Sequence, residues 1–371
     1  MSHGKIPLFV MLCLVFPGCG SSGEGDVDGA ADAQDSDAKP GADSDVDADT
    51  DTDNDTDADS DTDSDADGDG DIDGDGDADA DAYAGWSFAV AADPRAMQAE
   101  FRKTLVEIRD RTVNPSPLFG EAEFLLIAGD IDPDTDRYAD YNDIFGDAGA
   151  MQAYYPVMGN HDYYPDTGED AGDHRDYIYN TILPEQPGVV RHASNDASYY
   201  VDWKNVRLIA VDQYSSLGMD GCINDAGIGW VEDVVASADP SERVFISFHE
   251  PAFPRYRHVG DSFDACPVQR NAFWNMVVAN RDRVKAVFSG HTHYYVRMRV
   301  RDPASLEAND AGAFPDQDGG VCQINMGGVG WGPLTTFVRV SVASDTIRFR
   351  AFASENDAGA GFHVVDEWEV H

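Results

Sequence analysis

Five apolar segments of this chain each end in a polar loop that carries aspartate, asparagine or histidine, and this repeated pattern constrains the fold more than any other feature. The segments cover residues 86–92, 123–128, 154–158, 244–248 and 284–288. Short apolar runs with polar ends predict buried strands of an α/β sheet. In such sheets the ligand-binding loops lie at the carboxyl ends of the strands, so we expect these polar residues to meet at one site.

The rest of the sequence after residue 84 fits the same class of fold. Helices are expected over residues 97–111, 230–236 and 269–280, and a further strand over residues 199–211. Alternating apolar and polar residues over 337–342 and 346–352 predict half-buried antiparallel strands. An α/β domain is therefore predicted.

The residues that follow the five apolar segments offer imidazole, carboxylate and amide groups to a metal ion. They are Asp93, Gly129-Asp130, Gly159-Asn160-His161-Asp162, His249 and Gly290-His291-Thr292-His293. Nitrogen and oxygen ligands of these kinds suit Mn, Fe or Zn. None of the cysteines lies in a C-x-x-C pair, so a thiolate metal site is not expected.

In their order along the chain, these motifs resemble those of the calcineurin-like metallophosphoesterase superfamily, which includes purple acid phosphatases and phosphodiesterases. The resemblance spans about residues 86–300 and rests on G-N-H-[DE] and G-H-x-H occurring together in the family order. It implies a four-layer α/β/β/α sandwich, formed by a domain over residues 84–371. It also implies two divalent or trivalent transition metal ions at one rim of the sandwich.

The resemblance implies a role for each matching residue. The metal ligands would be Asp93 and His293 for the first ion, Asp130 as a bridge between the ions, and Asn160, His249 and His291 for the second ion. His161 would donate a proton to the leaving group, paired with Asp162 or another acid. The chemistry is reasonable because two cations can bind a phosphate and activate a water molecule, and a separate imidazole can protonate a departing alkoxide.

One position departs from the family pattern. The first motif of the family is D-x-H, and Arg95 stands at the position of its histidine. A guanidinium group has no lone pair to give to a metal, so the first metal site loses a ligand. Pro133 stands where a purple acid phosphatase supplies tyrosine. Two alternatives remain open: Arg95 holds a phosphate oxygen of the substrate, or it points away from the site.

Other polar residues are weaker candidates. Arg255, Arg257 and His258 follow the His249 loop, where members of the family present groups to the substrate. They are expected either to bind substrate or to form a solvated loop. His174 lies outside the motifs and is expected at the surface.

An acidic tract precedes the predicted domain. Every odd-numbered residue from Asp43 to Asp81 is aspartate, and residues 20–83 hold 26 of the 70 acidic residues of the chain. Such a segment has almost nothing to bury, so we expect a disordered, extended linker. The run that begins at Asp65 resembles the start of a calcium-binding loop. However, no even-numbered residue between Asp43 and Asp81 is acidic, and the last ligand of such a loop would fall on an even number.

The net charge of −45 excludes whole classes of partner. No basic stripe is present that could neutralise the phosphates of a nucleic acid, so we expect no nucleic-acid binding surface. An acidic surface also argues against docking onto anionic lipid. The resemblance to the metallophosphoesterases implies a small phosphoester substrate as the partner.

Residues 1–19 are similar to an export signal. Lys5 precedes an apolar run over residues 6–16, which is short for a membrane span, and Pro17-Gly18-Cys19 is similar to the end of a bacterial lipobox. Phe16 replaces the leucine that is usual there. We expect a lipid anchor on Cys19, with a plain cleaved signal peptide as the alternative. Both place the chain outside the cytoplasm, as an outer-membrane or cell-surface lipoprotein, or as a periplasmic or secreted protein.

Three cysteines lie in the predicted domain. They are Cys222, Cys266 and Cys322, and an oxidising compartment allows one pair of them to form a disulfide. We favour the pair Cys222 and Cys266.

The resemblance therefore implies metal-dependent hydrolysis of phosphate mono- or diesters by a metal-bound hydroxide, and the signal-like N-terminus places it outside the cytoplasm. The alternative is a catalytically impaired protein of the same fold that binds a ligand at the cell surface. Arg95 and the acidic linker are the features that favour this alternative. The oligomeric state is left open.

Overall fold

The structure, a computed structural model, describes residues 85–113, 121–146, 151–163, 171–192, 197–307, 314–355 and 361–371. The export signal and the acidic linker lie outside the described residues, so both stay predictions. The boundary of the folded domain at residue 84 stays a prediction as well.

Two large β-sheets form the centre of the described part of the chain. The six-stranded sheet has the order β15-β14-β13-β1-β2-β3, with bounds β1 (Trp86–Ala91), β2 (Ala122–Ile127), β3 (Ala153–Pro156), β13 (Leu334–Val342), β14 (Ile347–Glu355) and β15 (His363–Val370). The seven-stranded sheet has the order β11-β12-β10-β9-β6-β5-β4, with bounds β4 (Val189–Arg191), β5 (Tyr199–Trp203), β6 (Val206–Ala210), β9 (Arg243–Ser247), β10 (Val284–Ser289), β11 (Val296–Val300) and β12 (Val321–Asn325). A short hairpin joins β7 (Gly218–Met219) to β8 (Cys222–Ile223).

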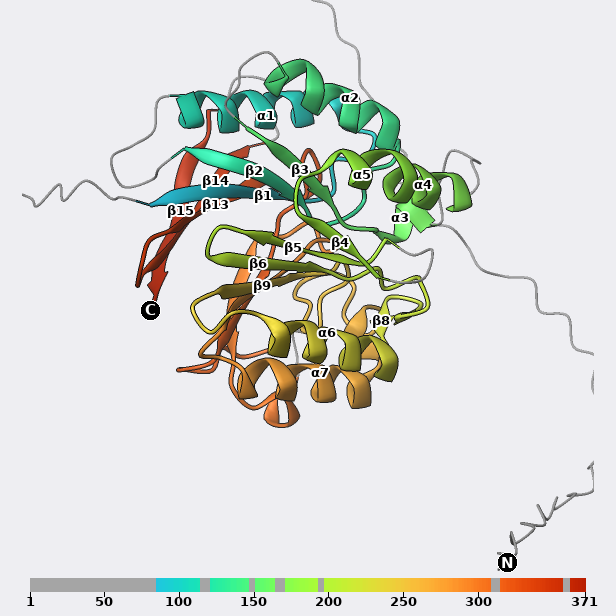
Figure 1. Cartoon of the computed structure of the whole chain (residues 1–371), viewed down its shortest axis with the longest axis vertical. Coiled ribbons are helices and arrows are strands. Elements are labelled where there is room, and N and C mark those ends of the chain that lie inside the picture. The colour runs from blue at the N-terminus through green and yellow to red at the C-terminus, as the bar shows by residue number, and fades with distance from the viewer. Residues whose placement is uncertain are drawn as a thin grey trace, which may run out of the picture. The chain divides into compact units, whose positions relative to one another are not determined.

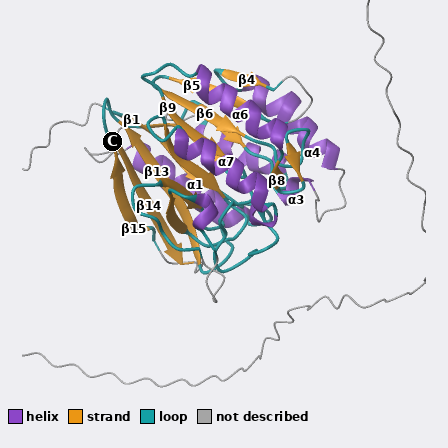
Figure 2. Ribbon diagram, turned by 90° about the horizontal axis from the view of Figure 1, so that it is seen from below, coloured by secondary structure: helices purple, strands orange, loops and turns teal. Residues whose placement is uncertain are grey.

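Helices cover the outer faces of both sheets (Figure 1). The helices α1 (Gln98–Val113) and α2 (Asp134–Phe145) lie over the six-stranded sheet, and α6 (Asp225–Ser237) and α7 (Pro267–Ala279) lie over the seven-stranded sheet. Shorter helical segments are α3 (Asn160–Tyr163), α4 (Ala171–Tyr177), η1 (Ile178–Ile182), α5 (Leu183–Glu185), η2 (Phe263–Ala265) and η3 (Pro303–Ser305). Seen from below, β13, β14 and β15 lie side by side (Figure 2). This arrangement confirms the predicted four-layer α/β/β/α sandwich.

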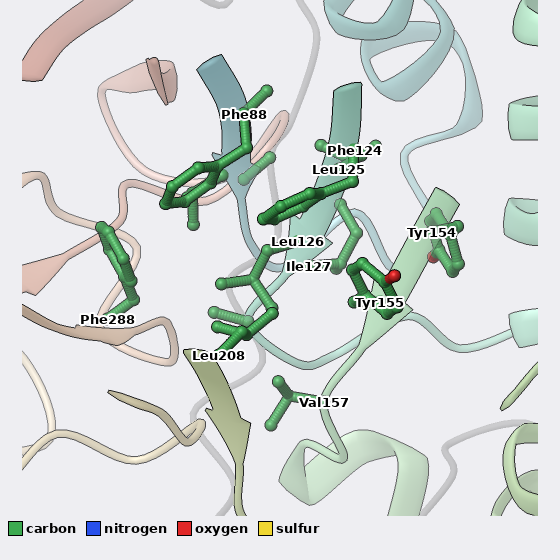
Figure 3. Packing of buried hydrophobic residues seen from close by; sticks show 14 of the residues in the cluster. Phe88, Phe124, Leu125, Leu126, Ile127, Tyr154, Tyr155, Val157, Leu208 and Phe288 are labelled. Carbon is green, nitrogen blue, oxygen red and sulfur yellow. The ribbon is translucent and has the colours of Figure 1, made fainter. Parts of the chain in front are cut away.

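Aromatic side chains hold the two sheets face to face (Figure 3). Phe88 of β1 stacks on Phe124 of β2 and meets the ring of Phe245 of β9 edge-on, with ring centroids 5.2 Å apart. Phe288 of β10 lies at the same interface, and all four side chains are fully buried. Each phenylalanine buried in this way stabilises the fold by about 2 kcal/mol. The packing therefore fixes the position of the strand ends of one sheet relative to those of the other.

Most of the predicted elements are confirmed, and one is wrong. Residues 199–211 form two antiparallel strands, β5 and β6, rather than one. A tight turn separates them, and Lys204 in this turn has a positive φ of 55°. Short hairpin turns favour such backbone angles, so the chain reverses within a run that otherwise looks continuous.

Two expectations about single residues have opposite outcomes. The disulfide between Cys222 and Cys266 is present, as favoured, whereas Cys322 is a buried free thiol. The expectation of a surface position for His174 is wrong, because its side chain is 2% exposed. Its ring lies 3.1 Å from a carboxylate oxygen of Asp134, so a buried ion pair offsets the cost of burying it.

Within the described residues, no helix combines the length and the apolar composition that crossing a membrane requires.

Candidate metal centre

The five motif-bearing segments are neighbouring parallel strands. β1, β2 and β3 run side by side in one sheet, and β9 and β10 run side by side in the other. Their carboxyl ends therefore lie at one edge of each sheet, and the packed sheets bring these edges together. The motif loops converge there, as the sequence pattern predicted.

One group of side chains forms a candidate cation site, with Asn160 and His249 at its centre. The Oδ1 atom of Asn160 lies 3.0 Å from Nε2 of His249 and 3.1 Å from Nδ1 of His291. Nε2 of His249 also lies 3.2 Å from Oδ1 of Asp130. Asp130 and His249 are essentially inaccessible to solvent, and His291 is 6% exposed. Separations of about 3 Å between donor atoms are those expected around a metal ion with ligand distances near 2.1 Å.

The hydrogen bonds of His249 show why a cation fits this group. Its Nδ1 atom lies 2.9 Å from the carbonyl oxygen of Ala128 and must donate, because a carbonyl only accepts. In the neutral ring, Nε2 then presents a lone pair to oxygen atoms of Asp130 and Asn160. Only a proton or a metal ion relieves the repulsion among these acceptors, so the residues fit a metal ion.

The electrostatics of the protein without a bound cation agree with this view. Burial lowers the pKa of His249, but the charge of Asp130, the hydrogen bond to Asp130 and the charge of Asp93 together outweigh burial and raise the pKa to about 10. Burial raises the pKa of Asp93 to about 7, with the charge of Asp130 adding to the effect. A proton on His249 thus occupies the place where a cation would neutralise Asp130, so metal binding must release that proton.

A second group consists of Asp93, Asp130 and His293. Each offers a ligand atom, and these atoms lie within 4.8 Å of one another. The carboxylate of Asp93 accepts from the main-chain N–H of His291 at 2.9 Å. This group has three ligands, one fewer than the group that contains Asn160.

Two guanidinium groups lie beside the group of three. Arg95 contacts the ring nitrogen Nδ1 of His161, and its Nε atom lies 4.0 Å from Oδ2 of Asp130. Arg257 places Nη1 at 2.6 Å from Nδ1 of His293. The Arg95 side chain thus lies against His161 and Asp130.

The other sequence candidates occupy different places. Asp162 is fully buried, and its two carboxylate oxygens accept from the main-chain N–H groups of Ile131 at 2.8 Å and Gly159 at 2.7 Å. It therefore ties the loop after β2 to the loop after β3. His258 packs its ring 4.1 Å from the ring of His291. Arg255 donates to the carbonyl oxygen of Phe314, which directs its guanidinium group to the main chain.

The glycines of the motifs are required by close approach. A Cβ atom on Gly129, where φ is 92°, would lie 2.2 Å from Nδ1 of His249. A Cβ atom on Gly159 would lie 2.3 Å from Oδ1 of Asp130. Any other residue at these positions would displace a ligand side chain.

The backbone of the ligand residues is strained as well. Positive φ angles of 53° to 71° occur at four candidate ligands other than glycine, namely Asp93, Asp130, His291 and His293. Such angles cost about 1 kcal/mol or more each and persist where the surrounding structure enforces them, often at functional sites.

Sequence reasoning missed Trp331. Its indole N–H donates to the main-chain oxygen of Arg95 at 3.0 Å, the Arg95 guanidinium lies 4.9 Å from its ring centroid, and its ring stacks on His293 at 5.5 Å. The signal in the sequence is the surrounding stretch 327–332, which contains four glycines. At Gly332, with φ of 68°, a Cβ would lie 2.2 Å from the carbonyl oxygen of His293.

Comparisons with known proteins agree with the geometry. A family model described as calcineurin-like phosphoesterase matches residues 87–295. Purple acid phosphatase PPD1 from yellow lupin (Lupinus luteus) seeds has a similar structure, with 13% identity and a TM-score of 0.52, over 77% of this chain and 53% of that one. A structure of PhoD has 10% identity and a TM-score of 0.49, over 77% of this chain and 69% of that one.

The similar structures support the fold, and the family model supports the family. The chain spans about half the length of the lupin phosphatase, and at this identity the likeness shows the fold alone. No curated protein matches the sequence. The family model covers more than half of the chain and includes every candidate metal ligand. The chain belongs to the calcineurin-like phosphoesterase family.

Proposed function

We propose that the chain is an exported hydrolase that cleaves small phosphate mono- or diesters at this metal centre. The family supports metal-dependent phosphoester hydrolysis and implies a dinuclear centre. The observation that carries the proposal is the cluster of Asp130, Asn160, His249 and His291. Nε2 of His249 lies 3.2 Å from Oδ1 of Asp130 and 3.0 Å from Oδ1 of Asn160, and Nδ1 of His291 lies 3.1 Å from the same Asn160 oxygen.

The residues of the centre have different proposed roles. Asn160, His249, His291 and Asp130 would hold a cation, and Asp93 and His293 adjoin them. When bound, metal ions of this kind neutralise the charge of the phosphate and activate the attacking water.

His161 is the candidate acid for the leaving group. Its main-chain N–H donates to Oδ1 of Asp130 at 3.0 Å, which places the ring at the edge of the centre. A guanidinium group has only donors, so Arg95 must donate to Nδ1 of His161. The neutral ring then carries its hydrogen on Nε2, and this N–H can donate a hydrogen bond to the leaving-group oxygen. Transfer of a proton requires the imidazolium form, in which Nδ1 also carries a hydrogen and Arg95 no longer donates to it.

One observation favours a second candidate function, a binding protein without turnover. The Arg95 side chain lies beside Asp130 at the position where the family motif has histidine. Such a protein would bind phosphate esters and release them unchanged. Turnover under any metal decides against it.

The test is hydrolysis of a nitrophenyl phosphate monoester and of the matching diester by the purified chain, stripped of metal and then supplied with Mn, Fe or Zn. His161→Ala should lower kcat about 10²- to 10⁴-fold without changing the metal content. His363→Ala is the matched control, because His363 is exposed on β15. Equal kcat values for His161→Ala and the control would show that His161 is not the acid. The ratio of the hydrolysis rates of the monoester and the diester identifies the substrate class.

Export is part of the proposal. Its support is the signal-like segment over residues 1–19 and the disulfide between Cys222 and Cys266, which is typical of proteins outside the cytoplasm. The full chain should be membrane-bound when produced in a Gram-negative host, and Cys19→Ala should release it. Retention of the Cys19→Ala variant on the membrane would contradict the lipid anchor.

A further inference from the structure

The contact between Arg257 and His293 has a consequence for metal binding. Arg257 Nη1 lies 2.6 Å from Nδ1 of His293. Guanidinium nitrogens only donate, so Nδ1 must accept, and the neutral ring carries its proton on Nε2. A protonated Nε2 has no lone pair for a metal ion. It lies 3.8 Å from Oδ1 of Asp93, which is beyond hydrogen-bond distance, so the tautomer follows from the Arg257 contact.

Arg95 also disfavours a metal ion at the group formed by Asp93, Asp130 and His293. Its Nε atom lies 4.0 Å from Oδ2 of Asp130, and its side chain is 14% exposed. Asp130 is the residue that would bridge two cations. A fixed positive charge at this distance neutralises the carboxylate and repels a cation at the position next to Asp93.

Trp331 holds the side chains of Arg95 and His293 in place. Its ring lies 4.9 Å from the Arg95 guanidinium and 5.5 Å from the His293 ring, with the two rings inclined by only 30°. Its indole N–H donates to the main-chain oxygen of Arg95. Stacking on an aromatic face orients a guanidinium group, so the positions of Arg95 and His293 are coupled through one side chain.

We propose that the site holds a single cation, bound by Asp130, Asn160, His249 and His291, and that Arg95 and Arg257 replace a second cation by binding the phosphoryl oxygens of the ester. This inference rests on the proposed function for the identity of the ester. Guanidinium groups suit the task because they bind phosphate through parallel, charge-assisted hydrogen bonds. The group of three formed by Asp93, Asp130 and His293 then stabilises the two arginines rather than a metal ion.

Counting cations tests the first half of the proposal. The metal-stripped full chain is incubated with excess Mn²⁺, passed through a desalting column and analysed for metal per chain. The expected result is one Mn²⁺ in the wild type, with the hyperfine spectrum of an isolated ion. The double variant Arg95→His, Arg257→Leu supplies an imidazole and frees Nδ1 of His293, so it should bind two ions. Two ions in the wild type, none in the wild type, or one in the double variant would each overturn the proposal.

Phosphate binding tests the second half. Titration of inorganic phosphate into the Mn²⁺-loaded chain should give a Kd that rises about 10- to 100-fold in Arg95→Met and in Arg257→Leu. Arg109→Met is the matched control, because Arg109 lies on α1 and pairs with its neighbour Asp110. Its Kd should equal that of the wild type. An unchanged Kd in both Arg95→Met and Arg257→Leu would overturn the role of the arginines.

The two readouts do not depend on turnover. One cation with arginine-dependent phosphate binding, but no hydrolysis, would contradict the proposed function and leave this inference standing. Hydrolysis that requires two cations per chain would support the proposed function and contradict this inference. The thermal unfolding midpoint of each variant confirms that a loss of binding is not a loss of the fold.

Discussion

Asp162 provides the sharpest distinction between a catalytic residue and a structural one. The family resemblance pairs this acid with His161, whereas the structure shows both of its carboxylate oxygens accepting from main-chain N–H groups, of Ile131 and Gly159. The side chain is fully buried. We therefore predict that Asp162→Ala weakens the fold and the metal site together, rather than the proton transfer alone.

The magnitude follows from the two hydrogen bonds. Removing the carboxylate leaves two buried N–H groups without that acceptor, and each unsatisfied buried donor costs about 1–3 kcal/mol. Asp162→Ala should therefore lower the free energy of unfolding by about 4 kcal/mol. Asp162→Asn retains one acceptor oxygen and should lower it by about 2 kcal/mol.

Guanidinium chloride unfolding of the metal-free chain measures these values, and metal titration of the folded variants measures the effect on the site. Asp143→Ala is the control, because Asp143 is exposed and pairs with Arg102 at the surface. It should lower the free energy of unfolding by less than about 1 kcal/mol. If Asp162→Ala is as stable as the wild type and binds metal normally while kcat falls, the structural role is refuted and Asp162 is catalytic.

Three further predictions concern other parts of the chain. Gly129→Ala should abolish metal binding, because its Cβ would lie 2.2 Å from Nδ1 of His249. Gly319→Ala is the control, because Gly319 also has a positive φ but has open space around it, and it should bind metal as the wild type does. Equal metal affinities of the two variants would contradict the close-approach argument. The hydrogen bond to Asp134 raises the pKa of His174 to about 9, so the stability that His174 contributes should be complete below pH 6.5 and lost as the pH rises through 9. The difference in unfolding free energy between the wild type and His174→Gln should therefore shrink by about 3 kcal/mol over that range, and a difference independent of pH would refute it. Replacing both Cys222 and Cys266 by alanine should lower the free energy of unfolding by about 4 kcal/mol, given the 44-residue separation of the disulfide, and unchanged stability would show that the bond does not constrain the unfolded chain.

The sequence predicts most of this fold because apolar strands and ligand motifs alternate along it. The strands that carry ligands are correct to within about two residues, since each ends where an apolar run meets a polar loop. The division of residues 199–211 into β5 and β6 was not predictable in this way, because the turn at Lys204 interrupts an apolar run without glycine or proline.

The candidate site, too, was predictable from the sequence only in part. The candidate metal ligands follow from their motifs, but contacts between distant segments do not. Trp331 meets Arg95 across 236 positions of sequence, and no local pattern signals that pairing. His174 was expected at the surface since a lone histidine carries no mark of its partner, and only the fold brings Asp134 to it.

The measurement that tests the central claim most directly is metal-restored turnover of a phosphate diester and monoester by the wild type beside Asn160→Ala. The side-chain oxygen of Asn160 lies within 3.1 Å of ring nitrogens of both His249 and His291, so the variant removes a candidate ligand that contacts two others. The account predicts no turnover by the metal-stripped chain, turnover by the wild type once metal is restored, and a loss of at least about 100-fold in Asn160→Ala. Turnover that is unchanged by metal removal or by Asn160→Ala, or a folded, metal-loaded wild type that hydrolyses neither substrate, would contradict it.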